Sequence, residues 1–110
     1  MPTIKYNKLV RDNIPEIINK CGDKTKYRVL SKEDFRQALK DKLVEEVNEF
    51  LAAETNSERI EELADIKEVI TAIRKAFSLK NKDINHYRQC KLYAKGGFNK
   101  RYFLESVEKD

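Results

Sequence analysis

Two long stretches of the sequence place apolar residues three and four positions apart, which is the spacing of one face of an α-helix. The first stretch spans about residues 32–54, and the second spans about residues 58–77. Three glycines and two prolines in 110 residues leave little room for the many turns of an all-β fold. The sequence therefore predicts an all-α fold, most simply a small bundle of four main helices.

Two shorter helices complete this expectation, over residues 12–20 and about residues 83–95. At the start of the helix over residues 12–20, Asp12 or Asn13 can cap the free amides. The helix over about residues 83–95 follows the similar sequence NKD and ends at a pair of glycines. Because no linker or internal repeat interrupts the chain, we expect residues 1–110 to form a single domain.

The size of the chain allows one core, but a thin one, so we expect self-association to complete it. Apolar residues make up 40% of the chain and charged residues 38%, and no apolar run is long enough to span a membrane. The first residues include no apolar signal-peptide region. The two cysteines lie far apart, as is common for reduced thiols, and together these features favour a cytoplasmic protein with no membrane partner.

The net charge of +4 is distributed unevenly along the chain. Residues 31–68 contain six basic and twelve acidic side chains, whereas residues 69–110 contain ten basic and four acidic ones. A nucleic-acid binder more often carries one continuous basic face, so we do not expect nucleic acid as the partner. An acidic centre between basic ends is typical of a metal site beside an anion site, although internal charge pairing is the alternative.

A glutamate interrupts the apolar face of the first long helix. At 100° per residue, Phe35, Leu39, Leu43, Val47 and Phe50 occupy one arc of the helix, and Glu46 falls inside that arc. A carboxylate on the core side is costly unless it is paired or coordinates a cation.

The second long helix repeats this pattern. Glu62 lies within its apolar arc, which includes Leu63, Ile66, Ile70, Ile73 and Phe77, with Ile60 and Val69 at the edges. Both helices thus carry a Glu-x-x-acid pair beside the buried face, Glu46 with Glu49 and Glu62 with Asp65. Because the connection is short, the helices should be antiparallel neighbours whose four carboxylates meet in one crevice.

Four carboxylates in one crevice repel one another unless a cation neutralises them. Mg²⁺ prefers oxygen ligands and often shares its shell with water and substrate phosphates, so Mg²⁺ is the predicted cofactor, with Mn²⁺ as an alternative. A single such pair is more often a solvated helix face, but two pairs on adjacent helices strengthen the interpretation as a metal site.

Basic residues near both ends of the chain are candidates for contacts with a phosphate chain, because lysine and arginine form charge-assisted hydrogen bonds with phosphates. Taken singly, each basic residue is better explained as a solubilising surface charge. The predicted substrate-binding residues are Asn7, Lys8, Arg11, Lys91, Lys95, Lys100 and Arg101.

The acidic residues also form a familiar sequence signature. Glu-Glu-x-x-Glu at 45–49, followed by Glu-x-x-Asp at 62–65, resembles the signature of the all-α nucleoside triphosphate pyrophosphohydrolases, which include MazG. The segments YNKLVRDNIPEII and KGGFNKRYFL resemble the small single-domain group described as MazG-like or phosphoribosyl-ATP pyrophosphohydrolase-like. Asn13 departs from the pattern, because many relatives have a lysine there, and this leaves one phosphate contact in doubt.

The resemblance implies Mg²⁺-dependent hydrolysis of a nucleotide substrate between its α- and β-phosphates, giving a nucleoside monophosphate and pyrophosphate. It assigns Mg²⁺ binding to Glu46, Glu49, Glu62 and Asp65, and the orientation or deprotonation of water to Glu45. Glu49 is the second candidate for the proton acceptor. The resemblance also implies a homodimer or homotetramer of helical bundles.

Two other readings remain open. A non-catalytic bundle would instead bind nucleic acid or a protein partner through its basic ends, and its acids would then form salt bridges. A nucleotide sensor that has lost turnover would keep the same ligand without hydrolysis. The nucleotide itself is left open, since a canonical or damaged triphosphate, phosphoribosyl-ATP and an alarmone all fit.

Overall fold

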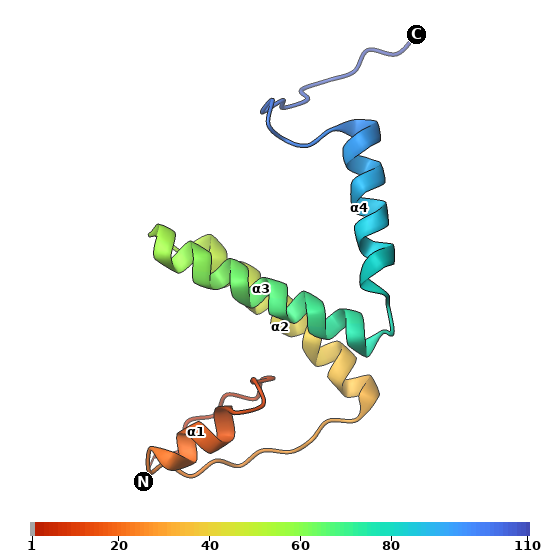
Figure 1. Ribbon diagram of the computed structural model, residues 1–110. Helices are drawn as coiled ribbons and strands as arrows, with labels where there is room; N and C mark the ends of the chain where they lie inside the picture. The colour runs from red at the N-terminus through yellow and green to blue at the C-terminus, as the bar shows by residue number, and fades with distance from the viewer. Residues whose placement is uncertain (1) are drawn as a thin grey trace. The chain divides into compact units, whose positions relative to one another are not determined.

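The computed structural model describes residues 2–110 of the chain (Figure 1). Four helices follow one another: α1 (Ile14–Lys20), α2 (Lys32–Ala52), α3 (Asn56–Ala76) and α4 (Asn81–Lys95). No strand forms among residues 2–110, so the predicted all-α class with four helices is confirmed. Within the same range, no helix is both long enough and apolar enough to cross a lipid bilayer.

The chain divides into two compact units, one ending at Ser78 and the other comprising Leu79–Asp110. The first unit holds α1, α2 and α3, and the second holds α4 and the irregular segment that follows it. All of the predicted acidic ligands therefore belong to the first unit. The expectation of a single domain stays a prediction.

Helices α2 and α3 pack against each other as a hairpin, and this hairpin is the framework of the first unit (Figure 1). The turn between them is short because Ala53 ends α2 and Thr55 already caps α3. The side chains of Ser31 and Thr55 accept hydrogen bonds from the amides of Asp34 and Glu58, respectively, each at 3.1 Å. Both caps satisfy amides that the helix itself leaves free, so the start of each long helix is fixed locally.

The centre of the hairpin is small. Leu39 is 2% exposed and Val69 is 8% exposed, and these are the buried apolar residues among those that the structure describes. Glu46 is buried between the helices as well, at 6% exposure. The predicted place of Glu46 on the core side of its helix is therefore confirmed.

The apolar arc predicted for α3 is partly wrong. Val69, expected at its edge, is the most buried residue of the helix, whereas Leu63 and Ile70 are 49% and 46% exposed. The packing direction is set by the crossing with α2, which turns the polar stripe containing Glu62 toward the partner helix. In α2, Val47 is likewise more exposed than its place in the arc implied, at 37%.

Three predicted helix starts also differ from the structure, and one of them is that of α3, which begins at Asn56 and not at about residue 58. Helix α1 begins after Asn13, whose side chain makes no capping hydrogen bond because its backbone already has helical angles. Helix α4 begins at Asn81, so the residues expected to precede it lie in its first turn, and Lys80 is the capping position. Helix ends of this kind depend on one or two backbone angles that the sequence pattern does not fix.

Candidate metal centre

Three of the predicted metal ligands come together where α2 and α3 cross. One carboxylate oxygen from each of Glu46, Glu49 and Glu62 lies within 4.8 Å of the other two. Glu46 is buried, Glu62 is half-buried and Glu49 is exposed, so the cluster is closed on the helix side and open toward solvent. Two turns of α2 and one residue of α3 therefore supply a set of oxygen donors.

Two oxygens of this cluster lack the partners that buried polar atoms normally have. Glu46 Oε2 and Glu62 Oε2 are both inaccessible to solvent, and neither has a hydrogen-bond partner among residues 2–110. Leaving a buried acceptor unsatisfied costs about 1–3 kcal/mol, and more when it is charged. The side chain of Glu46 is only 8% exposed, so solvent does not relieve this cost.

The carboxylates also perturb one another. Burial, together with the neighbouring Glu49 and Glu46, raises the pKa of Glu62 to about 7. Burial raises the pKa of Glu46 too, and Glu49 adds to the effect while Lys42 opposes it. Each shift means that the folded chain disfavours the ionised form, which a bound cation would reverse.

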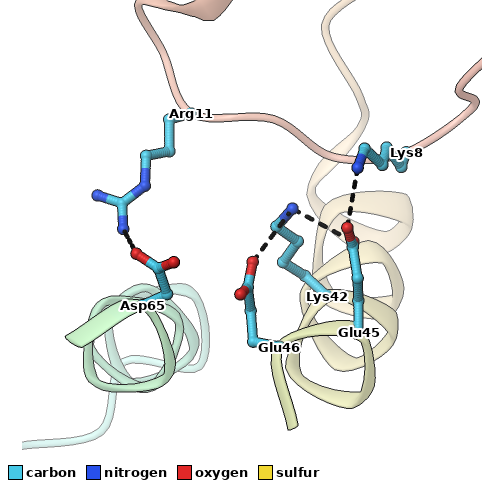
Figure 2. A network of polar contacts seen from close by, with 6 residues as sticks. All are labelled: Lys8, Arg11, Lys42, Glu45, Glu46 and Asp65. Carbon is cyan, nitrogen blue, oxygen red and sulfur yellow. Dashed lines mark hydrogen bonds and ion pairs between the residues drawn. The ribbon is translucent and has the colours of Figure 1, made fainter. Parts of the chain in front are cut away.

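Lys42 is the internal counter-charge of the site, and Figure 2 shows it between two glutamates of its own helix. Its ammonium lies 3.2 Å from Glu45 Oε2 and 3.4 Å from Glu46 Oε1. The side chain of Lys42 is only 16% exposed, so screening by water is limited. One lysine nevertheless compensates only part of the charge that the cluster carries.

The segment before α1 reaches across both helices of the hairpin (Figure 2). Lys8 binds Glu45 on α2 at 2.9 Å, and Arg11 binds Asp65 on α3 at 2.7 Å. Burial alone would raise the pKa of Glu45, but hydrogen bonds from Lys8 and Lys42 outweigh it and lower that pKa. Two of the residues predicted to contact phosphate thus lie directly beside the predicted acidic site.

The donor set suits a hard divalent cation. All of its atoms are carboxylate oxygens, which Mg²⁺, Mn²⁺ and Ca²⁺ prefer, and no histidine or cysteine belongs to the cluster. Separations of up to 4.8 Å slightly exceed the roughly 4.2 Å across an octahedral Mg²⁺ shell. This difference is about half an ångström, within the reach of small side-chain rotations, so Glu46, Glu49 and Glu62 fit such an ion.

The other predicted site residues have different surroundings. Asp65 does not belong to the cluster of three and is held by Arg11 instead. Asn7 lines a small cavity of about 110 Å³ with Lys8, Lys42 and Glu45. In the second unit every residue is exposed, including the predicted substrate-binding residues Lys91, Lys95, Lys100 and Arg101.

Sequence reasoning missed two features of the site. Lys42 lies three and four residues before Glu45 and Glu46, a spacing that places these side chains together on a helix, so it was detectable. The second feature is a groove of about 970 Å³, lined by residues 9–17 and by both long helices. Glu46 and Asp65 line it, so the groove adjoins the acidic cluster. No sequence pattern could reveal it, because its walls come from three separate segments.

The raised pKa of Glu62 predicts an unusual pH dependence of stability. A carboxylate with a folded pKa of about 7 and an ordinary unfolded pKa binds more protons when folded. In metal-free buffer, thermal stability should therefore fall as pH rises from about 5 to about 7.5. The change Glu62→Gln should flatten this profile, and Glu61→Gln on the exposed side of α3 should not, as differential scanning fluorimetry would measure. A flat profile for the unmodified chain would contradict the mutual repulsion of the three glutamates.

Comparisons with known proteins give one partial relative. The chain is 45% identical over 53 residues to an uncharacterized protein of Mycolicibacterium smegmatis. The match covers 48% of this chain and 54% of the relative, so the chain spans about half the length of the relative it matches. No family model matches the chain, and no solved structure matches it. The resemblance to the all-α pyrophosphohydrolases therefore stays a prediction.

Proposed function

We propose that this chain is a Mg²⁺-dependent nucleoside triphosphate pyrophosphohydrolase, which hydrolyses the bond between the α- and β-phosphates. The observation that carries the proposal is the convergence of Glu46, Glu49 and Glu62 with two buried, unpartnered oxygens. A purely structural cluster would match these oxygens with donors, as nearly all buried polar atoms are matched. The resemblance of the acidic signature to that superfamily supports the same conclusion.

In this proposal Glu46, Glu49 and Glu62 would hold the cation, and Asp65, which pairs with Arg11, would be a further ligand. When bound there, a divalent cation would supply positive charge for the phosphate oxygens and would activate water as a nucleophile. The burial of Glu46 keeps the local dielectric low, which strengthens each of these interactions. The open, solvent-facing side of the cluster is where the phosphate chain enters.

Glu49 is better suited than Glu45 to accept the proton of the attacking water. Glu45 is paired with Lys8 and Lys42, and its lowered pKa makes it a weak base. Glu49 is exposed and belongs to the cluster, so it can reach both the cation and a water molecule. We therefore assign the proton-accepting role to Glu49 and a supporting role to Glu45.

Lys8 and Arg11 are the phosphate-contacting residues favoured by position, since both already bind carboxylates that border the acidic cluster. An incoming phosphate group can replace these carboxylates as the partner of either cation. Roles for Asn7, Lys91, Lys95, Lys100 and Arg101 in substrate binding remain part of the proposal, and they rest on residue type alone.

A homodimer or homotetramer is part of the proposal as well. Apolar side chains on the outer faces of the hairpin are largely exposed, among them Val44 at 60%, Leu51 at 72% and Ile60 at 69%. A monomer rarely exposes so much apolar surface on one pair of helices, and a second hairpin of the same kind would cover it. The interface would also enlarge a core that contains few buried residues.

The non-catalytic bundle is the rival function, and one observation favours it. Asp65 and Glu46 each form an ion pair, as expected for acids with a structural role. Glu62 has no such pair among residues 2–110, and neither does Glu49, so half of the predicted quartet lacks the pairing that this function requires.

The direct test is incubation of the purified chain with a panel of nucleoside triphosphates, with and without Mg²⁺, followed by chromatography of the products. We expect a nucleoside monophosphate and pyrophosphate, formed only when the metal is present. Release of orthophosphate with a diphosphate product would contradict the site of cleavage. Absence of both turnover and Mg²⁺-dependent nucleotide binding would instead favour the non-catalytic bundle.

A further inference from the structure

The groove beside the acidic cluster has a composition that the metal site does not explain. It holds about 970 Å³, near the upper end of the range for small-molecule sites. One wall is formed by residues 9–17, and the opposite wall by α2 and α3. It follows α2 from Lys32 to Glu46, a distance of about 21 Å at 1.5 Å per residue.

The middle of the groove is apolar and its acidic end is the metal centre. Ile14 and Ile17 of α1 line one side, and Phe35, Val69 and Ala72 of the hairpin line the other. Flat aromatic ligands are held well by such walls, because their faces need no hydrogen bonds. Glu46 lines the groove and also contributes to the cluster of three carboxylates, so one ligand can occupy both.

Two uncharged polar residues of the groove can contact the polar edge of a ligand. Asn13 lines it and, because its amide does not cap α1, has no side-chain hydrogen bond among residues 2–110. Thr71 lines the same groove from α3 and carries a hydroxyl group. Charged residues, among them Lys32, Arg36 and Glu68, also line the groove around its apolar strip. A few polar groups that converge on a site fix the orientation of a bound small molecule.

We infer that this groove binds the base and sugar of the nucleotide whose phosphates lie at the acidic cluster, with Asn13 and Thr71 contacting the polar edge of the base or the ribose. The inference rests on the proposed function, since it takes the cluster as the phosphate end of the ligand. It makes the segment before α1 part of the specificity-determining wall.

The test compares inorganic tripolyphosphate with the α,β-methylene triphosphates of adenosine, guanosine, cytidine and uridine, which resist cleavage at this linkage. Binding is measured by isothermal titration calorimetry in saturating Mg²⁺. We expect at least one nucleotide to bind about tenfold or more tightly than tripolyphosphate, a difference of about 1.4 kcal/mol. That difference is the contribution of the groove.

Two matched variants then test whether this additional affinity comes from the groove. Ala72→Leu fills the groove wall and should remove most of the nucleotide advantage while leaving tripolyphosphate binding unchanged. Ala64→Leu makes the same change at an exposed position of α3 outside the groove and should alter neither affinity.

A second pair of variants keeps the test valid if Ala72→Leu misfolds, which circular dichroism would reveal. Asn13→Ala removes an exposed amide with no structural bond and should reduce the spread of affinities among the four bases. Asn85→Ala in α4 should not.

The outcomes separate the two proposals. The groove assignment is overturned, and the metal site stands, if nucleotides bind no more tightly than tripolyphosphate. The same conclusion follows if Ala72→Leu keeps the higher affinity for nucleotides and Asn13→Ala keeps the differences in affinity among the four bases. If neither nucleotides nor tripolyphosphate bind in the presence of Mg²⁺, the proposed phosphate site fails, and the groove assignment fails with it.

Discussion

Replacing Glu46 by glutamine should lower pyrophosphohydrolase turnover by at least about 100-fold while the helices remain folded. Glu46 is the most buried member of the acidic cluster, and one of its buried oxygens has no hydrogen-bond partner among residues 2–110. Removal of groups that only support a metal ligand already costs about 10–100-fold in affinity or activity, so loss of a ligand itself should cost more. Steady-state assays at saturating Mg²⁺ measure the effect.

In the absence of metal, the same substitution should not lower the stability of the chain and should tend to raise it. A neutral amide removes the repulsion between Glu46 and its two carboxylate neighbours, which raises the pKa of both Glu46 and Glu62 in the unmodified chain. Thermal unfolding of Glu46→Gln in metal-free buffer should therefore occur at the same temperature or a higher one. Added Mg²⁺ should stabilise the unmodified chain and have little effect on the variant.

Glu61→Gln is the matched control, because Glu61 is exposed on α3 and lies outside the cluster. It should retain normal turnover and a normal response to Mg²⁺. Near-normal turnover of Glu46→Gln would show that Glu46 is not a metal ligand. A large loss of stability in metal-free buffer would show instead that the carboxylate has a structural role through Lys42.

The two long helices were predictable because their signals are local and repeated. Ser31 and Thr55 fix where α2 and α3 begin, and each side chain accepts a hydrogen bond from the amide three residues ahead. The cap at Thr55 was not predicted, and α3 therefore begins two residues before its expected start at about residue 58. The short turn between them then leaves an antiparallel hairpin as the simplest arrangement. The burial of Glu46 followed from its position within the apolar arc, since α2 carries that arc toward α3.

The orientation of α3 was less predictable, because it depends on its partner. Its pattern offers two overlapping stripes, one through Leu63 and Ile70 and one through Glu62 and Val69. Periodicity alone favours the more apolar stripe, but α2 packs against the other. In the proposed oligomer the exposed stripe would contact a second copy, and periodicity does not indicate which of the two stripes faces α2.

The candidate site also has one part that the sequence predicts and one part that it does not. Three of the acids are brought together by helical spacing and one short turn, both of which the sequence contains. The contact of Arg11 with Asp65 joins residues 54 positions apart, so no local pattern specifies it. The groove is equally non-local, because its walls depend on where the segment before α1 crosses the hairpin.

The small core makes Leu39 the second position with a large expected effect. Leu39 is 2% exposed at the centre of the hairpin, and truncating such a leucine to alanine costs about 2–5 kcal/mol through lost contacts and the cavity left behind. Domains of this size are stable by only about 5–15 kcal/mol, so Leu39→Ala should remove a large part of the total. Urea unfolding followed by circular dichroism measures the loss.

Leu51→Ala is the matched control, because Leu51 lies on the same helix and is 72% exposed in a single chain. In a monomer this change should alter the free energy of unfolding by no more than about 0.5 kcal/mol. A loss comparable to that of Leu39→Ala would mean that a second copy buries Leu51 in solution. The midpoint of unfolding should then rise with protein concentration, because the folded state is stabilised by association. A further outcome is that the two variants lose the same free energy of unfolding with no dependence on protein concentration. That result would contradict the burial described for the hairpin, because an exposed leucine contributes as much as the central one only when a partner chain covers it.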